Sequence, residues 1–523
     1  MWHLGSRREG TTLCRRMKEQ HVTTPPLPPD KHAASADAAR VSVTPEVVTP
    51  SARWAISLSI ILGSLTNAVM MGSVNVAVPT MMTYLQADVT QIQWVLSSYM
   101  IARTVVQPTL GWIGGRVGNR RLYLGSLSLY VVTSMLCGLA WDLESMIFFR
   151  VLQGMSAGYL FPLAMTILHE TYPPDKRGMA MGIFMAGMSF GPAIGPSLGG
   201  YLVDHLSWRA VFYINFPIGL VALVAAALTL PAGGVRQHRS LDLLGLVTMT
   251  TFVVTLLVAV SETRTYGWTS PYVLGLLIAA VAMLLAFVWA ELTRAVPLVN
   301  LQIFANVPFV LSALVTFLES FTNFAMSLII ALFLQKGLGL SAQQAGEIML
   351  PAAFVWGLTS FFSGRLSDRI ESRWLILVGS LSQAVVLALF VGSMPASSAM
   401  AIAGLMILRS MTRGLIQSPI ITLSMVVLPD HQVRLGAGLR GLINSLGATF
   451  GVATSGFFLQ QRLAVWTQFF QEHPPRVLAV EMADSWLAQE ATTHASHDLF
   501  LAAAVAVVLT AIPVLWLRDR RIS

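Results

Sequence analysis

Long apolar stretches recur along almost the whole chain. Fourteen of them are close to the 20 residues that an α-helix needs to cross the roughly 30 Å hydrocarbon core of a bilayer. Their limits are 54–80, 91–112, 121–141, 145–168, 177–201, 208–230, 241–261, 271–291, 306–334, 344–366, 373–393, 397–424, 435–459 and 498–517. The pattern predicts an all-α integral membrane protein with 14 transmembrane helices.

Composition agrees with this prediction. Of the 523 residues, 55% are hydrophobic and 11% are charged, and the mean hydropathy is +0.67. A soluble enzyme of this length would expose too much apolar surface. The sequence has no phosphate-binding Gly-Lys-Ser/Thr loop, no metal-binding His-Glu-x-x-His or Cys-x-x-Cys pair, and no disulfide framework is implied by Cys14 and Cys137. We therefore expect no enzyme, no metal site and no cofactor.

Basic residues are unevenly divided between alternate loops. If the amino terminus is cytoplasmic, sixteen Lys and Arg residues fall in inward loops and the carboxyl tail, Arg440 among them, and five fall in outward loops. Because basic residues accumulate on the cytoplasmic side, we expect both termini in the cytoplasm. The expected location is a plasma membrane, most simply the inner membrane of a bacterium.

Three hydrophilic segments lie outside the apolar stretches. Residues 1–52 are basic, rich in proline and without apolar periodicity, which predicts a disordered cytoplasmic tail, and residues 518–523 form a second tail. Residues 460–497 are expected as an outward loop, because Pro474 and Pro475 argue against a continuous helix.

Two loops eight spans apart share one order of glycines and arginines. The matching residues are Gly111, Arg116, Gly118 and Arg120 in the first loop, and Gly364, Asp368, Arg369 and Arg373 in the second. This repeat predicts two six-helix bundles, residues 53–230 and 301–517, with two inserted helices in 231–300. The alternative is that the arginines only fix topology, which leaves the paired Gly-to-Arg frame unexplained.

A glycine-rich string lies in the fifth stretch. Its residues are Gly187, Gly191, Pro192, Gly195, Gly199 and Gly200. Glycines four apart bare one face of a helix so that a second helix can approach closely, and proline bends the helix. This suits a moving transporter, although a tightly packed static helix is the plainer alternative.

The string resembles the antiporter motif GxxxGPxxGGxL of the major facilitator superfamily, with Tyr201 in place of the last apolar residue, and the two loops resemble its motif GxLaDrxGrk. Residues 149–158, 208–219 and 291–304 are similar to further stretches of its fourteen-span drug:proton antiporter family, typified by EmrB and QacA. The resemblance implies efflux of small molecules in exchange for protons, and gate loops at the cytoplasmic ends of the helices. It also implies that spans one, four, nine and twelve line a central cavity.

Five charged residues fall well inside apolar stretches. They are Arg103, Arg150, Glu319, Arg409 and Arg413. A charge at mid-bilayer costs roughly 2.5 to 3.5 kcal/mol on the insertion scale, so such residues usually face a bundle interior or a wet cavity. Arg103 could instead reach the interface or pair with a carbonyl.

The ninth stretch carries Ser312, Thr316, Glu319 and Asn323 at spacings of four, three and four. These spacings predict one polar stripe on an otherwise apolar helix. A buried carboxylate balanced between desolvation and nearby arginine suits a proton carrier. Equally, Glu319 could lock two helices together through one arginine.

The twelfth stretch places Arg409, Arg413 and Gln417 four residues apart on one face. Planar guanidinium groups suit carboxylate, sulfonate or phosphate, so the cavity is expected to be cationic. Arg409 is the counterpart of Arg150, for which a packing role competes. Asn67 and Asn75 in the first stretch complete the expected cavity set.

Two positions depart from the family pattern. Met70 stands where the first span usually has aspartate, and Gly115 replaces the aspartate of the first gate loop. Both changes remove an acid, which leaves Glu319 alone, a carboxylate on the substrate, or no proton coupling at all. Of these, Glu319 is the expected proton site.

These features predict a proton-coupled exporter of amphipathic and perhaps anionic compounds, with protons and the lipid bilayer as partners and no role for nucleic acid. Because EmrB-type relatives work with a periplasmic adaptor, the segment 460–497 is the expected contact for such a protein. The first alternative is a dedicated exporter or an uncoupled facilitator of a siderophore, lipid or metabolite. The second is a transporter-like sensor or scaffold that no longer transports.

Overall fold

The computed structural model describes residues 49–231, 242–294, 297–340, 342–392, 399–473 and 483–517. Within these ranges the regular structure is helical and no β-strand occurs. Nearly all of the expected amino-terminal tail and the whole of 518–523 lie outside the described residues. The first described helix begins at Pro50, three residues before the limit expected for the bundle.

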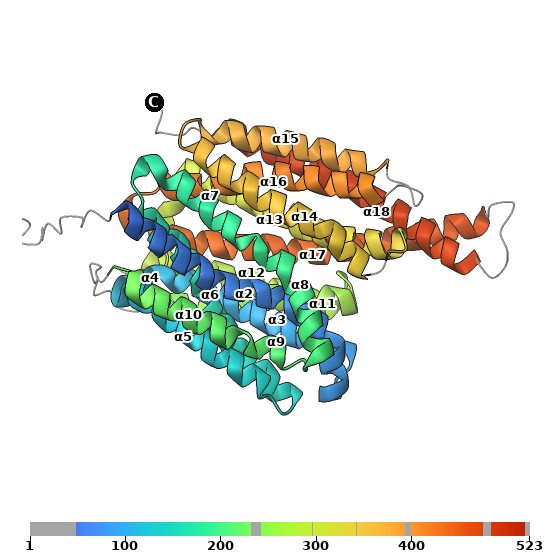
Figure 1. Ribbon diagram of the computed structural model, residues 1–523, viewed down its shortest axis with the longest axis horizontal. Helices are drawn as coiled ribbons and strands as arrows, with labels where there is room; N and C mark the ends of the chain where they lie inside the picture. Colours follow the sequence, from blue (N-terminus) through green and yellow to red (C-terminus); the bar gives the residue numbers. More distant parts are fainter. Residues whose placement is uncertain are drawn as a thin grey trace, which may run out of the picture. The chain divides into compact units, whose positions relative to one another are not determined.

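The first six spans form the first half of the fold (Figure 1). They are α2 (Pro50–Leu85), α3 (Val89–Val106) continued by η1 (Gln107–Thr109) and α4 (Leu110–Val117), α5 (Asn119–Gly138), α6 (Leu143–Thr171), α7 (Arg177–Met188) continued by α8 (Phe190–His205), and α9 (Ala210–Tyr213) continued by α10 (Asn215–Thr229). Prolines lie at the interruption after α3 and inside α8, where a missing backbone donor bends the helix.

Two inserted helices and a second set of six complete the chain. They are α11 (Leu243–Tyr266) and α12 (Pro271–Thr293), then α13 (Val307–Leu332), α14 (Ala342–Ser367), α15 (Ser372–Phe390), α16 (Ala399–Val426), α17 (Val433–Glu472) and α18 (Ala483–Leu515). The predicted order of fourteen helical spans is confirmed. Eleven of them are long and apolar enough to cross a membrane by length and composition, and the other three, α3 with α4, α5 and α16, each contain arginine.

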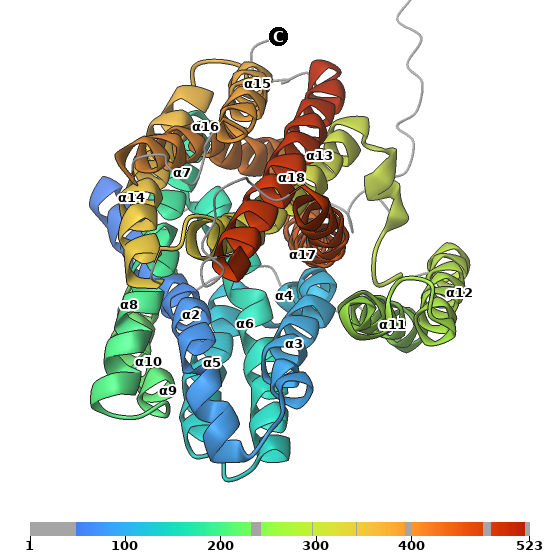
Figure 2. The same cartoon turned by 90° about the vertical axis from the view of Figure 1, so that its right-hand side faces the viewer.

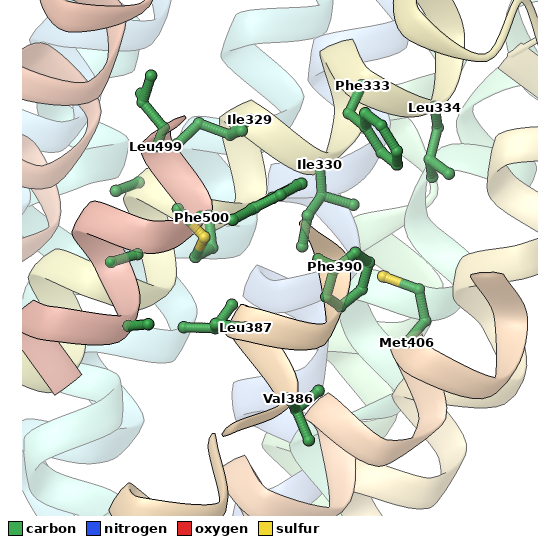
Figure 3. Packing of buried hydrophobic residues seen from close by; sticks show 14 of the residues in the cluster. Ile329, Ile330, Phe333, Leu334, Val386, Leu387, Phe390, Met406, Leu499 and Phe500 are labelled. Carbon is green, nitrogen blue, oxygen red and sulfur yellow. The ribbon is translucent and has the colours of Figure 1, made fainter. Parts of the chain in front are cut away.

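Each set of six packs mainly within itself. In the first, α2 contacts α8 and α10, and α6 contacts α3 and α5; in the second, α16 contacts α14 and α15, and α13 contacts α17 and α18. Phe333, Phe390 and Phe500, from three helices of the second set, meet in its apolar core (Figure 3). The sets join where α7 packs on α14 and where α17 packs on α4 and α6. The inserted pair stands to one side, with α11 beside α3 and α17 (Figure 2).

The glycine-rich string lies on the contact between α8 and α2. A Cβ atom on Gly195 would lie 2.7 Å from the Val69 carbonyl oxygen, and one on Gly199 would lie 2.6 Å from the Ser73 Cα atom. The Ser73 hydroxyl donates a hydrogen bond of 2.7 Å to the Gly195 carbonyl. Gly200 is different, because such a Cβ atom there would make only an ordinary van der Waals contact of 3.9 Å with Val76 Cγ1. The face of α8 that carries Gly195 and Gly199 therefore requires glycine, and the position of Gly200 does not.

The prediction of an outward loop over 460–497 is wrong for most of its length. Helix α17 continues to Glu472 and α18 begins at Ala483, and the two project together past the neighbouring helices (Figure 1). Asp498 binds them: its Oδ2 atom accepts hydrogen bonds of 2.7 Å from Arg462 and from the Trp466 indole. The described polar residues belong to a helical hairpin, and their composition resembles that of a loop.

Candidate functional site

A cavity of about 160 Å³ lies where the two sets of six helices meet. Four charged side chains line it, namely Arg103, Glu319, Arg413 and Arg440. Three of them are cationic, and Glu319 is the one carboxylate among the described residues that line the cavity. The cavity is therefore cationic, as expected from sequence.

The central feature is an ion pair between α13 and α16. Glu319 Oε1 lies 3.7 Å from Arg413 Nε, which is longer than a hydrogen bond. The Arg413 guanidinium also lies over the ring of Trp356, 4.3 Å from its centroid, in a cation–π contact. Glu319 is 8% exposed. A loose pair of this kind is easily separated when a proton or a ligand takes the place of one partner.

The polar stripes of α13 and α16 face each other. Asn323 and Gln417 line the same cavity as Glu319, and Arg409 Nη2 donates to Asn323 Oδ1 over 3.4 Å. The helix α13 is fixed at its start by Asn306, whose Oδ1 atom accepts from the Phe309 amide. Because Asn306 Nδ2 also donates to the Val427 carbonyl beyond α16, the same side chain ties the two helices together.

Other residues of the expected cavity set lie elsewhere. Arg150 is buried in the first half, where it donates to the Val95 carbonyl and to Gln153 and lies 4.2 Å from the Tyr99 ring centroid. Asn67 accepts a hydrogen bond from that same tyrosine. Both therefore act in packing between α2, α3 and α6, and neither lines the cavities described here.

Three further residues of that set are also away from the cavity. Asn75 is exposed and donates only to the Met71 carbonyl of its own helix. Ser312 and Thr316 are buried, and each donates to a carbonyl of α13. The four polar residues of the ninth span lie on one face of α13, as predicted. Of these four, Glu319 and Asn323 line the cavity.

Besides the four arginines expected inside spans, a fifth lies inside a helix, and the sequence prediction missed it. The prediction that Arg440 lies in an inward loop is wrong, because it lies inside α17, is 3% exposed and has Met165 Sδ 3.9 Å from its Nη1 atom. Asn444, four residues on, lines the same cavity. That spacing of four was the available signal, since it places both side chains on one helix face.

Met70 occupies a pocket rich in hydrogen-bond donors. Its sulfur lies 3.0 Å from the Tyr130 hydroxyl, 3.0 Å from Asn215 Nδ2 and 3.3 Å from Gln153 Nε2, with Ser134 at 3.8 Å. A thioether is a weak acceptor. The first half thus gathers amide and hydroxyl donors from three helices around an atom that satisfies them poorly.

The second gate loop reaches across to the first half. The Asp368 carboxylate accepts hydrogen bonds from the amides of Gly178 (2.7 Å) and Met179 (2.8 Å) at the start of α7, where a helix favours negative charge. A Cβ atom on Gly178 would lie 2.4 Å from the Gly364 carbonyl oxygen, so the two helices touch through backbone.

The described contacts of the other gate-loop arginines lie within their own set of six helices. Arg373 pairs with Glu371, Arg116 lies beside Trp112 of its own helix, and Arg120 donates to the Ala227 carbonyl in the first half. Arg369 is exposed. Gly118, with φ of +90°, ends α4 in a conformation that favours glycine.

The first gate loop meets the second half through apolar and small residues. A Cβ atom on Gly111 would contact Leu435 of α17 at 3.3 Å. The charged link at this end is Arg434 of α17, whose Nε lies 3.7 Å from Glu170 Oε1 of α6. Asn119 donates to the other oxygen of Glu170, so this acid holds both halves.

Residues 60–452 match the family model described as Major Facilitator Superfamily. The chain belongs to this superfamily. A multidrug export protein EmrB from Haemophilus influenzae is 31% identical over 402 residues, which cover 76% of this chain and 79% of that protein. The tetracenomycin C resistance and export protein of Streptomyces glaucescens is 30% identical over 415 residues, 78% of this chain and 76% of that protein.

A solved structure shares the superfamily fold. The human organic anion transporter MFSD10 (TETRAN) superposes with a TM-score of 0.58 at 14% sequence identity, covering 89% of this chain and 100% of that chain. The all-helical membrane transporter architecture expected from the sequence is confirmed. The roles of individual side chains rest on the geometry described above.

Proposed function

We propose that this major facilitator exports amphipathic small molecules from the cytoplasm in exchange for protons, with Glu319 as the proton carrier. The observation that carries the proposal is the position of this carboxylate in the central cavity, 3.7 Å from Arg413 and with Arg103 and Arg440 around the same space. Export functions in the names of its relatives, multidrug export and tetracenomycin C export, support it.

Whether the substrate and the proton compete for the cavity depends on the charge of the substrate. Antiport requires that substrate and proton compete for the same state of the cavity. A cationic or hydrogen-bond-donating group beside Glu319 favours the ionised carboxylate and so displaces the proton. An anion beside it favours the protonated form and does not compete. Proton exchange is therefore the mechanism for substrates that bring a positive or neutral group to the Glu319–Arg413 pair.

The excess of arginine supports a second candidate, the export of organic anions without proton exchange. Three arginines line the cavity with one carboxylate, and Arg409 lies behind Asn323. The membrane potential, negative inside, drives each anionic charge outward by about 2.3 kcal/mol per 100 mV. An anion would thus leave the cell with no help from Glu319.

Proteoliposomes containing the full chain separate the two candidates. Under a pH gradient alone, Glu319→Gln should abolish accumulation of a cationic dye, because the amide keeps the shape of the side chain and cannot exchange a proton. Glu347→Gln, the same change at an exposed position of α14, is the matched control. Full pH-driven accumulation by Glu319→Gln, at normal protein levels, would overturn the antiport proposal. Transport of an aromatic sulfonate under a membrane potential alone would support the second candidate.

The orientation and the partners belong to the same proposal. With both termini in the cytoplasm of a bacterial inner membrane, the hairpin of α17 and α18 projects into the periplasm, where it offers a contact for an adaptor protein. A reporter enzyme fused after Gln471 should report the outer side; a cytoplasmic signal would refute this topology.

Photo-crosslinkers along α17 from Arg462 to Glu472 should capture a periplasmic protein, and capture of lipid alone counts against the adaptor.

A further inference from the structure

A second and larger cavity, of about 340 Å³, lies beside the central one. Its walls come from α3, α11 and α17, with Met71 of α2 and Phe324 of α13. Arg103, Phe324 and Asn444 line both cavities. The two spaces therefore meet at these side chains, and a ligand in the larger one can touch the lining of the smaller one.

Arg103 differs from the other cavity arginines. Among the described residues no carboxylate lies within ion-pair distance of it, whereas Arg413 faces Glu319. Its Nη1 atom has a thioether partner, Met71 Sδ at 3.4 Å, and its Nε atom makes no hydrogen bond to the described residues. A half-buried guanidinium with one weak acceptor is a donor for an anionic ligand.

Polarity changes along the length of this cavity. At the inner end Thr104, Asn444 and Ser445 accompany Arg103. Ten residues earlier on α3, about 15 Å away at the helical rise, the exposed side chain of Gln93 marks the other end.

Between these two ends the lining is mostly apolar. Leu96 and Met100 of α3, Leu257 and Val260 of α11 and Val452 of α17 form it. Such a space fits a molecule with one polar end and an extended apolar body.

The apolar wall depends on the inserted helices. Leu257 and Val260 are buried, although α11 packs only against α12, α3 and α17 among the main contacts described. Without α11 this side of α3 and α17 would face lipid. The inserted pair thus adds a wall to a binding space that the two sets of six helices leave open.

We propose that the larger cavity is a binding site for monoanionic amphiphiles, with a carboxylate or sulfonate on Arg103 and an apolar body of up to about 15 Å along α3 and α11. The inference rests on the proposed function in one respect, since it takes the central cavity to be the transport path that the site feeds. It adds a location, a charge and a length for the ligand, and a role for α11.

Binding of tritiated dodecanoate to the purified full-length protein, competed by unlabelled dodecanoate or dodecanamide, tests the head-group contact. A charge-assisted hydrogen bond contributes about 1.5 kcal/mol or more, or roughly tenfold in Kd. We expect the wild type to prefer the carboxylate by at least that factor, Arg103→Gln to lose the preference and Arg103→Lys to keep it. Equal binding of acid and amide to the wild type, or an unchanged preference in Arg103→Gln, would overturn the site.

The wall is tested on α11. Ser261, which is half-buried and lines the cavity, is changed to Trp, and Val247, 53% exposed on the same helix, is changed to Trp as the control. We expect Ser261→Trp to weaken dodecanoate binding at least tenfold and Val247→Trp to leave it unchanged. If Ser261→Trp fails to fold, Ser261→Leu should weaken binding several-fold. Unchanged dodecanoate binding in a folded Ser261 variant would refute the proposed site.

The two proposals fail separately. Loss of pH-driven dye accumulation in Glu319→Gln together with an unchanged acid preference in Arg103→Gln refutes the site and leaves the exporter. The opposite pair of results refutes proton exchange through Glu319 and leaves the site.

Discussion

The two halves of this transporter share a scaffold and differ in their acids. In the first half α8 lies against α2 through Gly191, Gly195 and Gly199; in the second half α17 lies against α13, where a Cβ atom on Gly451 would be 2.2 Å from the Phe321 carbonyl oxygen. Backbone touches backbone in both.

The two halves differ at two positions, where the second half carries an acid and the first half does not. Glu319 lies in the cavity and Asp368 caps α7, whereas the first half has Met70 in α2 and Gly115 in α4. The donors around Met70 remain. Close packing of the helices thus constrains both halves, while one titrating site suffices for the proposed chemistry.

The largest effect is expected from reversing the charge of Arg413, the partner of Glu319. Arg413→Glu replaces the ion pair with two carboxylates and reduces the arginines that line the cavity to Arg103 and Arg440. We expect export of organic anions to fall at least tenfold and export of cationic dyes to rise, measured in inverted vesicles with equal amounts of protein. Lys336→Glu, the same reversal at an exposed position outside the cavity, should change neither. Continued export of anions by Arg413→Glu would contradict the cationic cavity.

Alanine at the glycine contacts tests whether the scaffold is equivalent in the two halves. Gly199→Ala forces a methyl group to within 2.6 Å of Ser73 Cα, and such overpacking costs about 1 to 3 kcal/mol. We expect a melting temperature lower by several degrees, by fluorescence-detected size exclusion after heating, and a similar loss for Gly451→Ala. Gly200→Ala, whose methyl group would make only an ordinary contact of 3.9 Å with Val76, is the control; equal losses at 199 and 200 would show that close approach does not set the requirement.

The gate contact is expected to have a smaller effect. Asp368→Asn keeps one acceptor and loses the charge, which weakens the cap on α7 by about 1 kcal/mol, or fivefold in population. Spin labels on the exposed Arg116 and Arg369 positions, read by pulsed dipolar spectroscopy, should show the open population rising by that factor. Asp175→Asn, an exposed acid just before α7, should leave the distances unchanged. The role of the cap is refuted if the two variants give the same distribution.

The mildest change returns an acid to the first half. Met70→Asp places a carboxylate among the donors of Tyr130, Gln153 and Asn215, so we expect normal yield and stability. In the Glu319→Gln background it should restore a fraction, about a tenth, of pH-driven accumulation. Met70→Asn, equal in shape and unable to titrate, should restore none. Identical behaviour of the two variants would mean that the donor pocket has no bearing on proton transfer.

Local patterns in the sequence predicted most of the fold. Apolar length predicted the fourteen spans, and spacings of three and four residues predicted the faces of α13 and α16 that meet at Glu319 and Arg413. Both predictions follow from the chain's own periodicity, which a helix converts directly into geometry.

Contacts between distant segments could not be predicted in this way. The donors on Met70 come from positions 130, 153 and 215, which no local pattern connects. Arg440 was misplaced because it lies near the start of its helix, where loop and span have similar composition. The 340 Å³ cavity needs α3, α11 and α17 together, and only tertiary packing brings them side by side.

The projecting hairpin has a mechanical consequence. Helix α17 contacts α4, α6 and α11 and extends thirteen residues past the limit expected for its span, from 459 to Glu472, which is about 20 Å of helix. Asp498 clamps α18 to it through Arg462 and Trp466. A tilt of roughly 10° at the base would swing the tip by about 3 Å over that length. Such a tilt would therefore turn a rearrangement at the cavity into a displacement at the tip of the hairpin, where a fluorophore would report it.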